Sequence, residues 1–273
     1  MLKNILSIDL EDYYCDLPFE LWKNYKERVV KNTKTILKHL ELYKAQATFF
    51  TLGYIAEKHP ELIEEIISKG HEISSHGYYH KDLRKISAVE FEKELFDSIK
   101  ILEKISGEKV LGFRAPFFSI TKNNFHMFEI IKKYLNYDSS IFPVKTSLYG
   151  IPDAPRYLYR MSNKNPLIED ENSNFIEIPL ATLKIPLIGN IPIAGGFYLR
   201  FLPNSIIKIG IKKMNKDGHP AMCYIHPKDI DPEMPKIPQY NWHYYYGLNS
   251  AEKKFESLLK NFNFSSVKET LLE

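Results

Sequence analysis

Short apolar runs alternate with stretches of helical period along most of the chain. Runs rich in β-forming residues predict strands at residues 4–9, 47–53, 71–76, 110–116, 137–143 and 221–227. Apolar residues at helical spacing predict helices over 32–44, 55–70, 88–106, 121–135, 204–217 and 250–262. This alternation predicts an α/β fold with a parallel sheet, either open or closed into a barrel.

The middle of the chain breaks this rhythm. Residues 145–200 hold several prolines and the turn AGGFY, and they predict long loops around one strand at 175–181. A last strand is predicted at 264–271. Because no repeat or flexible linker divides the chain, we expect a single domain over residues 1–273. It would carry an irregular insertion around 145–200 and a C-terminal extension around 228–273.

Composition and charge narrow the class of protein. Of the 273 residues, 44% are hydrophobic and 26% are charged, as in an ordinary globular protein. The net charge of +3 and the lack of a basic-aromatic motif argue against nucleic acid as a partner. Cys15 and Cys223 lie far apart, which argues against a disulfide framework and favours a reducing compartment.

Membrane association is expected at most at one segment. The N-terminal apolar run is too short for a secretion signal, and no run approaches the roughly 18 apolar residues that span a bilayer. We therefore expect a cytoplasmic protein. Residues 201–216 combine apolar residues with four lysines and predict a core-packed helix with a solvated lysine face. The alternative is a helix peripheral to the inner face of the membrane.

Reactive side chains follow five of the predicted strands, at the ends where α/β folds form their sites. They are Asp9 and Glu11, then His76 and His80, then Arg114, Asp138 and His226. Taken alone, each has a simpler explanation, such as an acid that caps a turn, a buried ion pair or a packed histidine. Their shared position at strand ends favours a common site.

The spacing of four of these residues indicates a metal site. Asp9 and Glu11 are two residues apart, so their side chains share one face of an extended chain. His76 and His80 have the i, i+4 spacing that places two imidazoles on one side of a helical turn. A carboxylate with two imidazoles leaves a coordination position open, as in catalytic transition-metal sites. With a further acid and a separate histidine, the set predicts metal-assisted hydrolysis of an amide or ester.

Five segments, in order, resemble the motifs of the polysaccharide deacetylases, also known as the NodB homology domain or carbohydrate esterase family four. They are SIDLEDYY, SHGYYH, GFRAPFFSIT, YDSSIFP and YIHP. Two further segments, IPIAGGFYLRFLP and HPKDIDPEMP, resemble the subgroup found in exopolysaccharide and exosortase gene clusters. The resemblance covers nearly the whole chain and implies a distorted (β/α) barrel of about seven parallel strands.

The resemblance also implies roles for the acids and histidines of the first two motifs. Asp9 would be the general base toward a water on the metal. The metal would be held by Glu11, His76 and His80, with zinc as the default for such a ligand set. Arg114 would pair with Asp9 and favour its charged form.

The remaining motifs would supply the acid and the substrate contacts. By the same resemblance, His226 would protonate the leaving amine and Asp138 would orient that histidine. A backbone N–H near Phe117 would stabilise the oxyanion. Tyr13, Phe117 and Phe118 offer flat faces for sugar rings.

The chain departs from the family pattern in its first and third motifs. Most relatives have two adjacent aspartates where this chain has Asp9-Leu10-Glu11. We therefore expect Glu11 as the ligand, with Asp12 as the alternative if the backbone turns early. The third motif ends in Phe117 and Phe118 where relatives have small residues, so the substrate groove should differ.

The expected function is a metal-dependent hydrolase that removes N-acetyl groups from an amino sugar. The sugar would belong to a polysaccharide or to its lipid- or nucleotide-linked precursor. One alternative is a hydrolase of cyclic amides, of the allantoin type, on the same scaffold. Another is a non-catalytic relative that binds glycans, although a separate base and acid argue against it.

Overall fold

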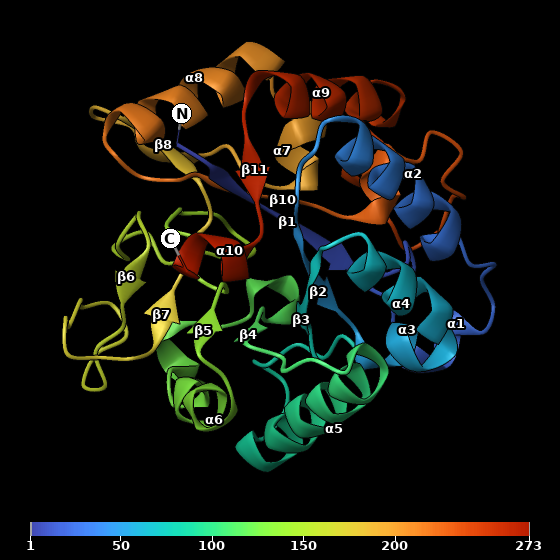
Figure 1. Ribbon diagram of the computed structural model, residues 1–273, viewed down its shortest axis with the longest axis horizontal. Coiled ribbons are helices and arrows are strands. Elements are labelled where there is room, and N and C mark those ends of the chain that lie inside the picture. Colours follow the sequence, from blue (N-terminus) through green and yellow to red (C-terminus); the bar gives the residue numbers. More distant parts are fainter. Residues whose placement is uncertain (1, 273) are drawn as a thin grey trace.

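The computed structural model describes residues 2–272, and its centre is a curled sheet surrounded by helices (Figure 1). Strand β1 (Asn4–Leu10) is buried along its whole length. It pairs in parallel with β2 (Thr48–Thr51) on one side and with β10 (Met222–Ile225) on the other. Ser7 lies opposite Thr48 in one neighbour and Tyr224 in the other, so segments far apart in sequence meet at β1.

The sheet continues in parallel through β3 (Glu72–Ser75), β4 (Gly112–Phe113), β5 (Tyr137–Asp138) and β7 (Ile176–Glu177). With β10, β1 and β2, these strands form a path of seven parallel strands within residues 2–272. A hydrogen bond of 3.0 Å from Ala181 N to Met222 O joins the segment after β7 to β10. The expected α/β fold with a curled sheet of about seven parallel strands is confirmed.

Two further strands extend this path. β6 (Tyr159–Arg160) adds an antiparallel edge next to β7. β11 (Phe264–Ser265) pairs in parallel with the first residues of β1. The predicted C-terminal strand at 264–271 is therefore wrong beyond its first two residues, because the chain turns at once into helix α10 (Val267–Leu272).

Helices connect the strands and cover the outside of the sheet (Figure 1). The first half of the chain holds α1 (Phe19–Trp22), α2 (Val29–Leu42), α3 (Gly53–Lys58), α4 (Pro60–Ser68), α5 (Ala88–Ser106) and α6 (Met127–Tyr134). The second half holds α7 (Gly196–Phe201), α8 (Asn204–Lys216), α9 (Leu248–Asn261) and α10. Short 3₁₀ turns lie at η1 (Pro116–Phe118), η2 (Lys122–Asn124), η3 (Pro227–Ile230) and η4 (Trp242–Tyr244).

The caps that the sequence carries explain where some helices begin and end. Ser87 Oγ accepts a hydrogen bond from Glu90 N and starts α5, and Gly107, with φ of +68°, ends it. The helix predicted over 55–70 is broken in two, because Pro60 has no N–H and starts a new helix, α4.

The irregular region around 145–200 contains one hairpin that the sequence pattern did not predict. β8 (Thr182–Ile185) pairs antiparallel with β9 (Gly189–Pro192). Helix α8 packs next to this hairpin and buries Ile207, Ile211 and Met214, as expected for a core-packed helix. No helix in the described part of the chain has the length and hydrophobicity of a membrane span.

Candidate active site

The carboxyl ends of the parallel strands open into a cleft of about 590 Å³. Most of the residues predicted from the strand ends line it: Asp9, Glu11, His76, His80, Phe117, Phe118 and His226. Arg114 lies directly beneath this lining, is fully buried and contacts Asp9. The fold therefore gathers residues spread over more than 200 positions into one site.

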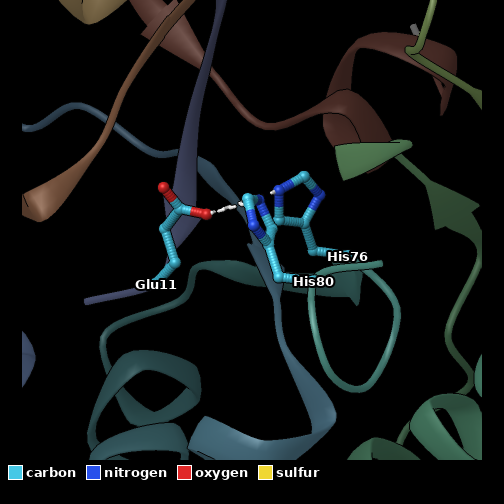
Figure 2. A group of neighbouring side chains, drawn as sticks. All are labelled: Glu11, His76 and His80. Atoms are coloured by element: carbon cyan, nitrogen blue, oxygen red, sulfur yellow. Dashed lines mark ion pairs between the residues drawn. The ribbon is translucent and has the colours of Figure 1, made fainter. Parts of the chain in front are cut away.

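Glu11, His76 and His80 point toward one another at the base of the cleft (Figure 2). Their nearest donor atoms lie within 4.8 Å of one another, and all three side chains are buried. Glu11 Oε2 is 2.7 Å from His80 Nε2 and 3.9 Å from His76 Nε2. This oxygen accepts no hydrogen bond, which is costly for a buried carboxylate unless a cation sits beside it.

Backbone carbonyls orient both imidazoles. His76 Nδ1 lies 2.7 Å from the carbonyl of Arg114, and His80 Nδ1 lies 3.0 Å from the carbonyl of Cys15. A carbonyl can only accept, so each Nδ1 carries a proton and donates it to the backbone, and both Nε2 atoms face Glu11. Burial lowers the pKa of His76 to about 4, which keeps this ring in the neutral form that binds a metal.

Lys228 binds the other oxygen of the same carboxylate. Its Nζ lies 2.7 Å from Glu11 Oε1 and 3.0 Å from Asp16 Oδ2. Burial alone would raise the pKa of Glu11, but His80 and Lys228 outweigh it and hold this pKa well below its ordinary value. Lys228 thus leaves Oε2 as the oxygen that faces the imidazoles.

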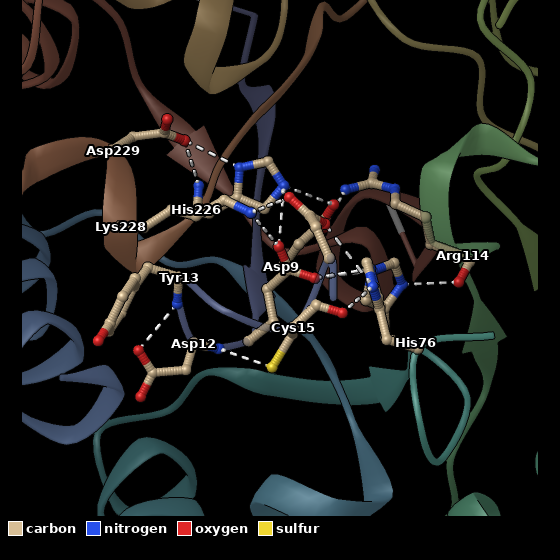
Figure 3. A network of polar contacts seen from close by, with 12 residues as sticks. Asp9, Asp12, Tyr13, Cys15, His76, Arg114, His226, Lys228 and Asp229 are labelled. Atoms are coloured by element: carbon tan, nitrogen blue, oxygen red, sulfur yellow. Dashed lines mark hydrogen bonds and ion pairs between the residues drawn. The ribbon is translucent and has the colours of Figure 1, made fainter. Parts of the chain in front are cut away.

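Arg114 lies beside Asp9 and fixes its side chain (Figure 3). Its Nη1 donates to Asp9 Oδ1 at 2.5 Å and to Ser7 Oγ at 2.8 Å. The opposite side of the guanidinium donates to Ser139, through Nε to the carbonyl and through Nη2 to Oγ. The ring of Phe50 covers the guanidinium at 4.2 Å. This buried arginine, bonded through all three of its nitrogens, fixes the side chain of Asp9 where it lines the cleft.

His226 reaches the cleft from the end of β10. Its Nε2 lies 3.8 Å from Asp9 Oδ2 and 3.7 Å from Glu11 Oε1. Its Nδ1 lies 2.9 Å from Asp229 Oδ2, and Asp229 also accepts the backbone N–H of His226 (Figure 3). Burial and Lys228 lower the pKa of His226, but Asp229 outweighs them and the net shift is upward.

The partner of His226 corrects the expectation that Asp138 orients this histidine. Asp138 is fully buried and accepts hydrogen bonds from the N–H and Oγ of Ser140. Burial raises the pKa of Asp138 to about 6, and that of its neighbour Glu177 well above the ordinary value. Ser140 Oγ in turn accepts the N–H of Ala115, so Asp138 supports the backbone next to Arg114.

Two further expectations are corrected in the first motif. Asp12 accepts the backbone N–H groups of Tyr13, Arg28 and Val29, so it caps the start of α2 and is not part of the ligand set. Tyr13 is 2% exposed, packs against Tyr14 and does not line the cleft, so it presents no face to a sugar there.

The turn that carries Phe117 and Phe118 has an unusual backbone. Both residues have positive φ, +58° and +48°, a region that costs free energy for residues with large side chains. The turn places both rings in the cleft, and the Phe117 ring lies 4.5 Å from that of His80. Both residues therefore line the cleft, and their contact with a substrate stays a prediction.

Comparison with known proteins accounts for both halves of the chain. Residues 20–132 match the family model described as polysaccharide deacetylase. This part of the chain therefore carries a polysaccharide deacetylase domain. Residues 139–272 match a second model, described as a domain of unknown function (DUF3473). Tyr224, His226, Lys228 and Asp229, all of which line the cleft, lie in this second half.

Named relatives support the assignment over part of their length. The peptidoglycan-N-acetylglucosamine deacetylase of Bacillus cereus is 34% identical over 91 residues, which cover 33% of this chain and 33% of that protein. The peptidoglycan-N-acetylmuramic acid deacetylase PdaC of Bacillus subtilis is 36% identical over 85 residues, 31% of this chain and 18% of the relative. The chain therefore spans a third or less of these two proteins.

A solved structure shows the same fold over almost the whole chain. The crystal structure of a protein assigned as a polysaccharide deacetylase from Mycobacterium smegmatis superposes with a TM-score of 0.61 and 16% identity. The superposition covers 98% of this chain and 89% of that one. At this identity the likeness concerns the fold alone.

Proposed function

We propose that this protein is a metal-dependent N-deacetylase of an acetamido sugar. The observation that carries the proposal is the buried carboxylate oxygen Glu11 Oε2, which faces the Nε2 atoms of two buried imidazoles that backbone carbonyls hold in place. The names of the family and of the relatives support a carbohydrate substrate. We propose an N-acetylated sugar unit of a polysaccharide or of its lipid- or nucleotide-linked precursor.

The residues present fit one divalent transition metal. Glu11, His76 and His80 would hold it, and zinc is the first candidate for one carboxylate and two imidazoles. When bound, the ion supplies Lewis acidity for the acetamide carbonyl and stabilises negative charge on its oxygen.

The chain's own residues supply the proton transfers. Asp9 accepts the proton of the attacking water, while Arg114 fixes the orientation of this carboxylate. His226, protonated and held by Asp229, donates a proton to the sugar nitrogen as the C–N bond breaks. Water adds to the acetyl carbon, so the products are acetate and the free amino sugar.

The test is the metal content of the purified protein together with acetate release from a chitooligosaccharide. About one transition metal per chain with release of acetate would support the deacetylase. Metal without acetate would exclude the chitooligosaccharide as substrate and keep the hydrolase site. Acetate release from lipid-linked or nucleotide-linked sugars would then support the deacetylase, and turnover of small cyclic ureides would favour the cyclic-amide hydrolase instead. If no metal binds after reconstitution, the catalytic proposal fails and the glycan-binding alternative takes its place.

Location and membrane contact stay predictions. Ile209 and Phe201 are 57% and 48% exposed, close in sequence to the lysines of α8, and we keep residues 201–216 as the segment for peripheral contact. Sedimentation with anionic vesicles, compared for the natural chain and a Phe201→Ser, Ile209→Ser variant, tests this contact.

A further inference from the structure

The cleft has an aromatic rim that none of the proton-transfer or ligand roles uses. Trp242 and His243 from η4 line it together with Phe197 from α7. The indole of Trp242 is 64% exposed, whereas the chain's other tryptophan, Trp22, is 2% exposed. A large apolar ring left in water at the mouth of a binding cleft is characteristic of a contact surface for a ligand.

The segment that carries Trp242 is held rigidly. The buried Arg200 donates from Nη1 to the backbone carbonyls of His243, Tyr244 and Tyr246, at 2.8, 3.1 and 2.8 Å. The ring of Tyr240 stacks on that of Tyr244 with centroids 3.9 Å apart. The exposed ring is therefore presented on a fixed backbone, which lowers the entropy cost of binding.

The same arginine connects this rim to the proposed acid. Arg200 Nε donates to Asp229 Oδ1 at 3.0 Å, and Asp229 Oδ2 holds His226 Nδ1. One buried guanidinium thus positions both the group that would protonate the leaving nitrogen and the aromatic segment beside it. The rim and the reacting centre are parts of one rigid arrangement.

We propose that Trp242, with Phe197 and His243 beside it, is a platform that stacks one pyranose ring of a glycan chain. The ring it holds neighbours the sugar unit that reacts at Glu11, His76 and His80. A pyranose has an apolar C–H face and polar edges, which matches a flat indole rimmed by polar groups. The identity of the glycan rests on the proposed function. A platform that holds the neighbouring ring requires a substrate of at least two sugars.

The platform also assigns a role to the part of the chain that matches a domain of unknown function. Phe197, Arg200 and the 240–246 segment all lie within residues 139–272. In this scheme the second half supplies the proton donor and selects the length of the glycan, while the first half supplies the ligand set.

Binding is tested first, without turnover, by tryptophan fluorescence. Trp22 is buried away from the cleft, so a change in emission on adding chitopentaose should come from Trp242. We expect a saturable change in the natural protein and in the Trp22→Phe variant, and none in Trp242→Phe. An unchanged emission in the natural protein, or the same change in Trp242→Phe, would overturn the platform.

Kinetics then separate stacking from a structural effect. We expect Trp242→Ala to raise KM for acetate release from chitopentaose by about tenfold, the size of one lost aromatic contact, and to leave KM for N-acetylglucosamine unchanged. Trp242→Tyr, which keeps a flat ring, should restore most of the loss. Phe96→Ala removes another exposed aromatic side chain, 48% exposed on α5 and outside the cleft lining, and should change neither constant.

The two proposals fail in different ways. Saturable Trp242-dependent binding without acetate would keep the platform and overturn the deacetylase. Acetate release in which the ratio of KM for chitopentaose to KM for N-acetylglucosamine is the same in Trp242→Ala and the natural protein would keep the deacetylase and overturn the platform.

Discussion

At the scale of single residues, the proposed function assigns metal binding and proton transfer to different side chains. His76 directs its Nε2 at the ligand oxygen of Glu11, whereas Asp9 is bonded to Arg114 and lies outside the cluster of three ligands. We therefore expect Asp9→Asn to keep the metal and lose about 10²–10⁴-fold in kcat, the usual contribution of a general base. His76→Ala should lose both metal and turnover.

Metal content by mass spectrometry and acetate release, measured on the same preparations, check this division. Circular dichroism shows whether each variant is folded. Full activity of Asp9→Asn would refute Asp9 as the base, and a full complement of metal in His76→Ala would remove this histidine from the ligand set.

We expect the carboxylate of Asp229 to influence the upper pH limit of the proposed activity through His226. It raises the pKa of His226 against burial and Lys228, so His226 stays protonated, and able to donate, to a higher pH. In Asp229→Asn that charge is lost, so we expect the pKa of His226 to fall and the alkaline limb of kcat/KM to move to lower pH. The pH profile of both proteins measures the shift; an unmoved limb would assign it to another group.

The grouping of candidate residues at strand ends was predictable, because it depends only on where each strand stops. Glu11 and His80 meet for this reason, although they lie far apart in sequence. The partner of His226 was missed because the 3₁₀ turn η3 returns Asp229 to the histidine, and strand periodicity does not describe that turn. Lys228 was missed because a buried lysine is recognised only from the acids around it, Glu11 and Asp16.

At the scale of elements, Asp12 links the first motif to helix α2. Its carboxylate accepts the N–H groups of Arg28 and Val29 at the start of this helix. These two residues lie 16 and 17 positions after Asp12 in the sequence. We expect Asp12→Ala to destabilise the protein by about 2 kcal/mol, because buried N–H groups lose a charged acceptor. Urea unfolding measures this loss, and Asp12→Asn, which keeps an acceptor oxygen, should lose less.

The same variant distinguishes a cap from a ligand. Asp12→Ala should retain its full content of metal, since Asp12 lies outside the group of Glu11, His76 and His80. Loss of metal in a folded Asp12→Ala protein would restore the alternative in which Asp12 coordinates it.

Helices and strands could be predicted where the neighbouring sequence carries the signal. They were predicted less well where contacts with distant residues determine the local structure. α5 has its N-cap at Ser87 and its C-terminal Gly107 in the sequence itself. The hairpin of β8 and β9 forms an isolated two-stranded sheet whose residues alternate poorly between buried and exposed, so periodicity did not reveal it. α10 follows β11 because Thr48 Oγ1 and Glu72 Oε2 accept the first N–H groups of the helix, a contact set by residues some 200 positions away.

At the scale of the whole molecule, two sequence families share one sheet. β1 lies between β2, from the half that matches the deacetylase model, and β10, from the half that matches the domain of unknown function. Glu11 belongs to the first motif, yet its oxygen is held by Lys228 from the second half. Neither half can complete the sheet or the site alone, which favours the single domain expected from the sequence.

Each half of the chain carries one cysteine, which can report whether the two halves unfold together. Cys15 and Cys223 are both buried and free, and burial raises the pKa of both thiols, that of Cys223 to about 12. Only unfolding exposes them as reactive thiolates.

Because β1 joins both halves, we expect one cooperative unfolding transition. Pulse alkylation of Cys15 and of Cys223 should rise at the same urea concentration, and this concentration should coincide with the loss of circular dichroism. The experiment uses the full chain with a chelator present, so that a bound metal does not protect Cys15 selectively. Labelling of Cys223 at a clearly lower urea concentration than Cys15 would mean that the second half unfolds by itself, and the single-domain interpretation would be wrong.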